Sequence, residues 1–213
     1  MSLGIVGVGR MGRALARAAA ASAEPVVVCS ARADPRSMPA LPPGCVVASL
    51  DQVWRFSRTV VLAVPFPVAM ALVSGPAGRH GDGRTLIDAT NPGLYPDRPL
   101  PPDVSGGELI AEAAVAWQVA KAFNTVAADQ MPIGGWSGEP VPLPVGGSPA
   151  AKADVFPLAR RLGFEPVDAG DIRASRELES LAVLLARISA AHENRGGIGL
   201  TMVRPRAFAQ DPS

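Results

Sequence analysis

The sequence predicts an α/β fold in which a doubly wound, mainly parallel sheet is followed by a small C-terminal helical lobe. Two observations carry this prediction: short runs rich in Val and Ile alternate with helix-like stretches, and the chain begins with such a run. Strands that helices cover on both faces are nearly continuous in apolar residues, as these runs are. The length of 213 residues, 48% of them hydrophobic, allows one such domain with a modest extension.

Each element is expected from its local sequence. Residues 10–23 are crowded with alanine and predict the first helix, which Pro25 ends. Three prolines place the extended segment 140–145 at or near a sheet edge, and leucines at helical spacing predict the terminal helix. The strands are expected at 3–8, 26–29, 46–48, 59–64, 85–90, 118–123, 140–145 and 164–168. The helices are expected at 10–23, 67–74, 108–115, 148–162 and about 174–192.

Composition narrows the classes of protein. We expect a single domain over residues 1–203 and a flexible, polar tail over 204–213. Apolar stretches end well before the roughly 18–20 residues that a bilayer span needs, and the N-terminus does not resemble a secretion signal. Cys29 and Cys45 lack CxxC spacing, which predicts core thiols in a reducing cytoplasm and no metal site. A formal charge of +1 argues against a nucleic-acid partner.

A glycine-rich turn closes the first expected strand. Gly7-Val8-Gly9-Arg10-Met11-Gly12 fits the pattern GxGxxG at a junction of strand and helix. In a dinucleotide site the first glycine permits the tight turn, the second lets the backbone approach a pyrophosphate, and the third lets the helix pack closely on the sheet. The turn therefore predicts a Rossmann-type dinucleotide site. The alternative is that these glycines form a tight turn and nothing more.

The residues after the second expected strand bear on the choice between NAD and NADP. NAD enzymes usually place an acidic residue there, which accepts a hydrogen bond from the ribose 2′-hydroxyl. This chain has Ser30 and Arg32 instead, a hydroxyl and a guanidinium that can hold a 2′-phosphate. NADP is therefore favoured. The alternatives are that Asp34 accepts a hydrogen bond from the ribose of NAD, and that Arg32 is a solvated loop residue without a role in binding.

Four further loops follow expected strand ends, where open α/β sheets bind ligands. They cover residues 65–67, 91–93, 124–126 and 146–148. Their asparagines can hydrogen-bond a carboxamide or a carbonyl group. The Asn, Pro and Gly residues of any single loop are also typical of an ordinary turn, but four such loops after strand ends together favour a binding crevice.

Few side chains could donate the proton that a carbonyl or imine reduction needs. Tyr95 and Lys121 are low-ranking candidates, whereas His80 precedes a strand at the wrong end of the sheet and His192 ends the last helix. A Ser–His–Asp arrangement, a Tyr-x-x-x-Lys pair and an HExxH motif are missing from the sequence, which sets hydrolytic and zinc chemistry aside.

Taken together, these residues resemble a known family, the NADPH-dependent reductases of the deazaflavin coenzyme F420, also called F420H2:NADP oxidoreductases. The resemblance runs nearly from end to end of the chain. Its most specific part consists of residues 164–170 and the following segment 175–181. It rests further on residues 7–12, 63–65, 88–92, 119–125 and 142–147.

The resemblance implies a Rossmann domain, usually dimeric, in which nicotinamide and deazaflavin stack face to face and a hydride passes directly between them. No acid or base of the protein is needed in such a reaction, because the ring protons exchange with solvent. Ser30 matches a 2′-phosphate contact of the family, whereas a neighbouring family arginine is Ala31 here, with Arg32 one place later. Residues 196–199 are glycine-rich where the family pattern has apolar residues that close over the deazaflavin.

The leading hypothesis is thus an NADPH-dependent oxidoreductase acting on F420 or a flavin-like ring, a homodimer of the cytoplasm. The alternatives are an NADPH-dependent reductase of a small imine or carbonyl compound and a non-enzymatic NADP-binding redox sensor. The expected cofactor contacts are Gly7, Val8, Gly9, Arg10, Met11, Gly12, Ser30, Arg32, Ala63, Val64, Pro65, Asn91, Pro92, Asn124 and Thr125. The expected acceptor contacts are Phe66, Val126, Gly146, Gly147 and Ile198, and no metal is expected.

Overall fold

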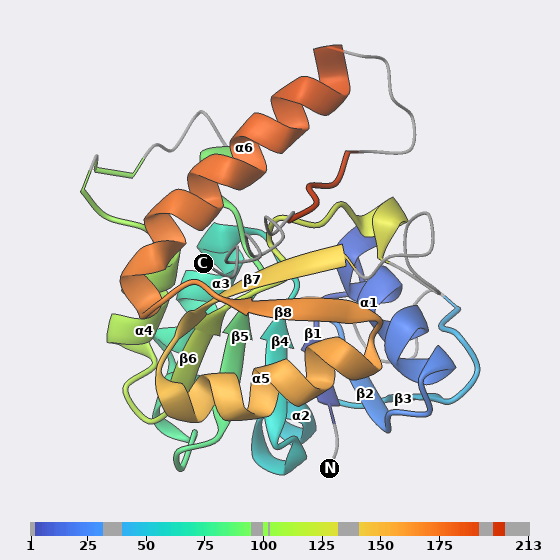
Figure 1. The fold of residues 1–213 in the computed structure, drawn as a ribbon. Helices are drawn as coiled ribbons and strands as arrows, with labels where there is room; N and C mark the ends of the chain where they lie inside the picture. The colour runs from blue at the N-terminus through green and yellow to red at the C-terminus, as the bar shows by residue number, and fades with distance from the viewer. Residues whose placement is uncertain are drawn as a thin grey trace, which may run out of the picture.

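The computed structural model describes residues 3–31, 40–94, 100–101, 103–131, 141–191 and 198–202. Within them, eight strands form one sheet in the order β3-β2-β1-β4-β5-β6-β7-β8 (Figure 1), which confirms the predicted fold class. The order changes direction between β1 and β4, and such a switch point is where doubly wound sheets bind ligands. The strands are β1 (Leu3–Val6), β2 (Val26–Cys29), β3 (Cys45–Val47), β4 (Thr59–Leu62), β5 (Thr85–Asp88), β6 (Gln118–Lys121), β7 (Val141–Gly147) and β8 (Phe164–Asp168).

Helices cover both faces of the sheet, because side chains of the central strands alternate between two hydrophobic clusters. On one face, α1 and α5 pack on side chains such as Ile5. On the other face, α2, α3 and α4 pack on side chains such as Val6. The helices are α1 (Arg10–Ala21), α2 (Leu50–Phe56), α3 (Phe66–Val73), α4 (Gly106–Ala113), α5 (Pro149–Arg161) and α6 (Ser175–Ala191), with short 3-10 turns η2 (Pro76–Arg79), η3 (Pro92–Leu94), η4 (Ala128–Gln130) and η5 (Ile172–Ala174).

The proline-rich strand β7 lies next to the edge of the sheet, as its prolines predict. It pairs antiparallel with β6 through Gly146 and Gly147, and parallel with the edge strand β8 along its length. Pro142 and Pro144 precede the pairing with β6, so their missing N–H groups interrupt no hydrogen bond to that strand.

Two helix starts differ from the sequence prediction by more than one residue, and capping explains both. Helix α2 was not expected; Ser49 begins it with a capping box, in which its side chain accepts from the backbone N–H of Gln52. Helix α4 begins at Gly106 rather than at residue 108, because Ser105 forms a second capping box with Glu108. Serine followed three residues later by Gln or Glu is visible in the sequence at both places.

Helix α6 extends beyond the carboxyl ends of the strands, as Figure 1 shows in orange, and its first turns pack beside α4. Leu178 and Leu185 are buried against the body of the chain, whereas Leu184 is 52% exposed. The helix matches the expected range closely, although His192 and the expected tail 204–213 lie outside the described residues. None of the helices in the described part of the chain is long and apolar enough to cross a membrane.

Candidate active site

The three glycines of the turn after β1 differ in whether neighbouring backbone atoms leave room for a side chain. Gly7 has a φ of +123°, and a Cβ there would overlap the backbone oxygen of Ala63. A Cβ on Gly12 would overlap the backbone oxygen of Gly7. Gly9 has an ordinary φ of −69° and open space where a Cβ would stand. Since no atom of the described residues requires glycine at position 9, the space in front of it fits a ligand that approaches the backbone closely.

The N-terminus of α1 opens onto the same space. Gly9 caps the helix without a side-chain hydrogen bond, and the first turn carries no acidic residue. The free N–H groups and the helix dipole therefore present positive charge to this space, as a pyrophosphate requires. The geometry fits the predicted dinucleotide. Ser30 follows β2 at this end of the sheet and is half-buried, whereas Arg32, Asp34 and Tyr95 lie outside the described residues.

Asn91 and Asn124, which follow β5 and β6, form a fixed amide pair. The Nδ2 group of Asn91 donates to the backbone oxygen of Asn124 over 2.7 Å. The Nδ2 group of Asn124 donates to Asn91 Oδ1 and to the backbone oxygen of Leu178, each over 2.9 Å. Both donors of Asn124 are thereby used, so the amide cannot rotate without losing them. Its Oδ1 is buried and has no hydrogen-bond partner in the described structure, which leaves an acceptor for a ligand N–H.

An unusual backbone conformation places this amide pair. Phe123, directly before Asn124, has a φ of +64°, a left-handed conformation that bulky side chains rarely adopt. Its ring is fully buried and meets the ring of Phe164 edge-to-face, with centroids 5.8 Å apart. Packing of the aromatic ring thus holds a turn that local preference disfavours, as is common at binding sites.

A cavity of about 1020 Å³ lies over this edge of the sheet, between the N-terminus of α1 and helix α6. The titratable side chains among its described lining residues are Arg10 and Asp129, which pair with each other over 3.4 Å. Small or apolar side chains make up most of the remaining wall. The lining residues are Arg10, Met11, Asn91, Leu94, Asn124, Thr125, Val126, Ala127, Ala128, Asp129, Ala182, Leu185, Ala186, Ser189, Ala190 and Ile198. We refer to this space as the main cavity.

The wall that α6 contributes was missed from sequence. Ala182, Ala186 and Ala190 recur every fourth residue, so they share one face of the helix, with Leu185 and Ser189 beside them. This row of small residues was the signal that could have revealed the wall. A smaller cavity of about 190 Å³ adjoins it and shares Thr125, Val126, Leu185 and Ile198 with the main cavity.

Lys121 is not placed to donate a proton to a ligand. Its side chain is fully buried, and its Nζ donates to Asp88 over 2.8 Å, to Glu179 over 2.6 Å and to the backbone oxygen of Thr90 over 2.7 Å. Because an ammonium has three N–H bonds, these partners use its whole capacity. The sequence prediction of a proton donor is therefore wrong for Lys121, which serves as a buried structural cation.

Glu179, which the sequence analysis did not single out, links α6 to the rest of the site. Besides binding Lys121, its carboxylate accepts the backbone N–H groups of Gly106 and Gly107, each over 3.0 Å. These N–H groups belong to the first turn of α4, so the side chain of Glu179 also caps the N-terminus of that helix. Helix α6 thus joins α4 and the sheet at one buried point next to the amide pair.

Three of the five predicted acceptor residues do not line the main cavity. Phe66 is buried and contacts the backbone region of Gly106. Gly146 and Gly147 are buried between β6 and the η5 turn, where a Cβ on Gly147 would stand 2.8 Å from the backbone oxygen of Val119. For these three the structure replaces a ligand contact with close packing. Val126 and Ile198 do line the main cavity, as do the predicted cofactor residues Arg10, Met11, Asn91, Asn124 and Thr125.

The other predicted cofactor residues that the structure describes do not line the main cavity. Ala63 and Val64 follow β4 and touch the position of Gly7, and Pro65 caps α3. Pro92 is buried beside Gly106, at the η3 turn. These positions surround the turn after β1 and are compatible with contacts to a dinucleotide.

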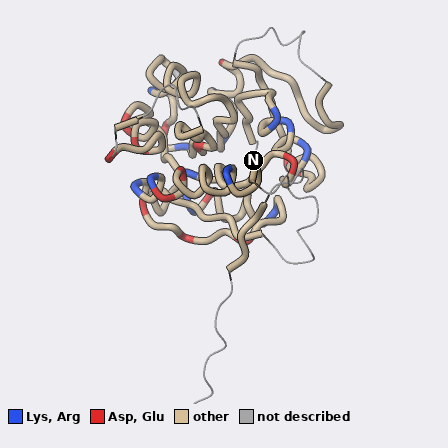
Figure 2. Tube along the Cα trace, turned by 90° about the horizontal axis from the view of Figure 1, so that it is seen from above, with Lys and Arg blue, Asp and Glu red and all other residues tan. Residues whose placement is uncertain are grey.

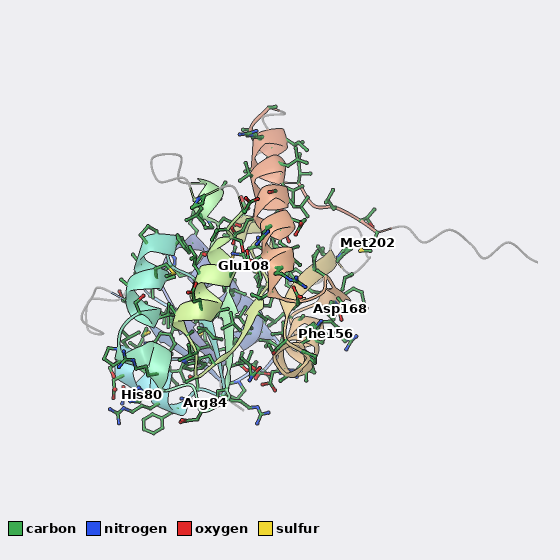
Figure 3. The ribbon with its side chains drawn as sticks, turned by 90° about the vertical axis from the view of Figure 1, so that its left-hand side faces the viewer. His80, Arg84, Glu108, Phe156, Asp168 and Met202 are labelled. Atoms are coloured by element: carbon green, nitrogen blue, oxygen red, sulfur yellow. The ribbon has the colours of Figure 1, made fainter. Side chains whose placement is uncertain are left out.

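The remaining reactive side chains are remote or inert. Burial raises the pKa of the Cys29 thiol to about 12, and burial also raises the pKa of Cys45. Figure 3 shows His80 at the opposite end of the molecule from Met202, which lines the smaller cavity; the ring of His80 meets the backbone oxygen of Pro76. The described residues contain no group of three His, Cys, Asp or Glu side chains that could hold a metal ion.

Comparison with known proteins gives a curated relative and a family model. The curated relative Metalloreductase STEAP3 of Rattus norvegicus is 30% identical over 183 residues, which make up 86% of this chain and 36% of that protein. The chain thus spans about a third of the length of that relative. A family model described as NADP oxidoreductase coenzyme F420-dependent matches residues 2–92.

Solved structures share the fold over most of the chain. A protein of Arthrobacter sp. FB24, whose name proposes an F420-dependent NADP reductase, superposes with a TM-score of 0.82 at 26% identity, over 96% of this chain and 100% of that one. Hypothetical protein SMa0349 of Sinorhizobium meliloti superposes with a TM-score of 0.72 at 26% identity, over 82% of this chain and 87% of that one. An imine reductase of Myxococcus stipitatus in complex with NADP+ shares the fold at 18% identity, with a TM-score of 0.66 over 91% of this chain and 63% of that one. The resemblance inferred from the motifs is therefore confirmed: residues 2–92 match the family model of NADP oxidoreductases that depend on coenzyme F420, and the Arthrobacter protein shares the fold over nearly the whole chain.

Proposed function

We propose that the protein transfers a hydride between NADP(H) and a flat ring acceptor, the deazaflavin F420 or a flavin. The observation that carries this proposal is the main cavity, which adjoins the N-terminus of α1 and is walled by small and apolar side chains over a fixed amide pair. A volume of about 1020 Å³ has room for a large ring next to a nicotinamide. The family match and the similar Arthrobacter protein support the same acceptor.

The coenzyme end of this site is built from the turn after β1. Gly9 leaves room for the pyrophosphate, and the free N–H groups of α1 hold its charge. When bound, NADPH supplies the hydride. The free Oδ1 of Asn124 is suited to accept a hydrogen bond from the carboxamide of the nicotinamide, and Asn91 keeps that oxygen in place.

The lining of the main cavity favours an acceptor that needs no proton from the protein. Arg10 and Asp129 neutralise each other, and the other described lining side chains cannot titrate near neutral pH. A ring that takes up hydride and exchanges its own protons with solvent fits such a wall. Catalysis then consists of alignment: α6 and the loops after β5 and β6 hold two rings in contact and keep water out.

The direct test mixes the protein with NADPH and F420, FMN or riboflavin and follows the nicotinamide absorbance. We expect oxidation of NADPH by at least one ring acceptor. A chelated ferric ion serves as a comparison, because the curated relative is a metalloreductase by name. Lack of NADPH oxidation by every ring would overturn the proposal. Loss of turnover in Tyr95→Phe would favour the alternative of an imine or carbonyl reductase that uses a proton donor.

The 2′-phosphate assignment needs its own test, because Arg32 lies outside the described residues. We propose that Ser30 and Arg32 select NADP. Arg32→Ala should then weaken binding of NADPH about tenfold, the size of one charge-assisted hydrogen bond, and leave binding of NADH nearly unchanged. Equal losses for the two coenzymes would contradict this assignment.

A homodimer and a cytoplasmic location remain proposals. Leu178 and Leu185 pack on the chain itself, and Leu184 is the exposed member of the leucine row. Sedimentation velocity over a range of concentrations should show a dimer that Leu184→Asp weakens. A monomer at all concentrations would contradict the dimer.

A further inference from the structure

We propose that a groove along α1 binds the anionic tail, a phosphate or carboxylate, of the ring acceptor. This inference rests on the proposed function and extends it to a second part of the substrate. The groove has a volume of about 670 Å³. We call it the arginine groove; its lining residues are Arg10, Arg13, Ala14, Arg17, Ala40, Leu41, Pro42, Pro43, Ala128 and Asp129.

Three arginines from one helix face the groove. Arg10, Arg13 and Arg17 stand three and four residues apart in α1, so they project from the same side of the helix. With a rise of about 1.5 Å per residue, they span about 10 Å along the axis. Figure 2 shows blue basic positions on several sides of the molecule, among them the side where α1 lies in Figure 1. All three are exposed.

The groove carries more positive charge than its own residues neutralise. Asp129 is its single described carboxylate, and it pairs with Arg10 over 3.4 Å while their side chains are 41% and 78% exposed. Such an exposed pair is weak. Arg13 and Arg17 form no ion pair within the described part of the chain. Among the described residues these two guanidinium groups therefore have no carboxylate partner, and the planar geometry of each suits bidentate binding of phosphate or carboxylate.

The arginine groove continues the main cavity. Arg10, Ala128 and Asp129 line both spaces, so a ring in the main cavity can extend a substituent past them into the groove. The opposite wall, from Ala40 to Pro43, is apolar and offers the tail no competing charge. Two joined spaces, one apolar and one cationic, match an acceptor with a flat ring at one end and an anion at the other.

The coenzyme is the other possible source of an anion, but its phosphates have places elsewhere. The pyrophosphate fits the space before Gly9, at the N-terminus of α1. The 2′-phosphate is expected after β2, near Ser30. Arg13 and Arg17 lie one and two turns further along α1 than the pyrophosphate position before Gly9. We therefore assign the groove to the acceptor.

FMN and riboflavin test this assignment, because they share one ring and differ in a phosphate. Their binding to the full chain is followed by quenching of flavin fluorescence, and NADPH binding is measured separately. The variant is Arg13→Gln with Arg17→Gln, and the control is Arg79→Gln, an exposed arginine of η2 that does not line the cavity or the groove. In the double variant we expect the Kd of FMN to rise about tenfold, as for lost charge-assisted contacts, with riboflavin and NADPH within about twofold.

The outcomes separate the sources of the anion. A rise in the Kd of NADPH with no change for FMN would assign the groove to the coenzyme and overturn the proposal. Equal Kd values of FMN and riboflavin in the wild-type protein, or failure of both to bind, would also overturn it. Because the assay measures binding, Arg-dependent preference for FMN would support the groove even if no ring were reduced. Such a result would contradict the proposed function alone.

Discussion

At the scale of single residues, the turn after β1 separates the demands of folding from those of binding. Gly7 and Gly12 are required by neighbouring backbone atoms, whereas Gly9 faces open space. The sequence motif does not distinguish a glycine that folding requires from one that a ligand requires. In the described part of the chain no atom requires glycine at position 9, so a substitution of Gly9 tests directly for a bound ligand.

Substitution of these glycines by alanine should therefore give opposite results. Gly12→Ala should lower the free energy of unfolding by about 1–3 kcal/mol, because its Cβ overlaps the backbone of Gly7. Gly9→Ala should change it by less than about 1 kcal/mol, since it affects a helix cap alone. The Kd of NADPH should nevertheless rise about tenfold or more in Gly9→Ala. Urea denaturation and coenzyme fluorescence measure the two quantities, and unchanged NADPH binding in Gly9→Ala would remove the pyrophosphate from this place.

Lys121 makes a second residue-scale prediction. Lys121→Met should lower the free energy of unfolding by about 3–5 kcal/mol, because Asp88 and Glu179 would stay buried without a cation. Lys152→Met is the matched control, since its partner Asp168 is 59% exposed; its cost should stay below about 1 kcal/mol. Similar costs for both variants in urea denaturation would refute the structural role of Lys121.

At the scale of elements, helices α4 and α6 are tied together twice. Glu179 of α6 accepts from the first N–H groups of α4. In return, Arg176 of α6 donates to Glu108 of α4 through two hydrogen bonds of 2.8 and 2.9 Å, and Figure 3 shows Glu108 beside α6. The base of α6, from which the wall of the main cavity continues, is therefore fixed to α4.

The second tie predicts a pH dependence. The hydrogen bond from Arg176, with help from Ser105, lowers the pKa of Glu108 to about 2 from its ordinary value of 4.5. A carboxyl group whose pKa is lower in the folded state stabilises the fold above the ordinary value, and this contribution disappears as the pH falls from 4.5 towards 2. The stability difference between the wild type and Glu108→Gln should thus be constant near neutral pH and shrink over that interval. A difference that does not vary with pH in denaturation experiments would exclude the ion pair as its cause.

At the scale of the whole molecule, the parts that the sequence predicts well are those set by local pattern. Buried strands such as β4 and the turn after β1 were predicted from runs of Val and from glycine spacing. Residues that meet through tertiary contact were not: Glu179 and Lys121 lie 58 positions apart, and neither reads as half of a buried pair. Gly146 and Gly147 were assigned to a ligand because their neighbours in space, β6 and η5, cannot be known from sequence.

Coenzyme binding should stabilise the whole molecule if the site is built in the folded state. NADPH at 100 times its Kd should raise the free energy of unfolding by about 2.7 kcal/mol. The increase should be much smaller for Gly9→Ala at the same concentration. Thermal denaturation with and without NADPH measures it, and an absence of any shift in the wild type would count against the proposed site.

The attachment of α6 also limits how this protein could be altered. The first two turns of the helix contain Glu179, and its removal would take a carboxylate partner from the buried ammonium group of Lys121. These turns are therefore poorly suited to redesign. The later turns, from Ala182 to Ala190, contribute the small side chains that line the main cavity. Substitutions that enlarge or reduce these small side chains are therefore the most direct way to change which acceptor the main cavity binds. The first two turns of α6 should be left unchanged in such variants.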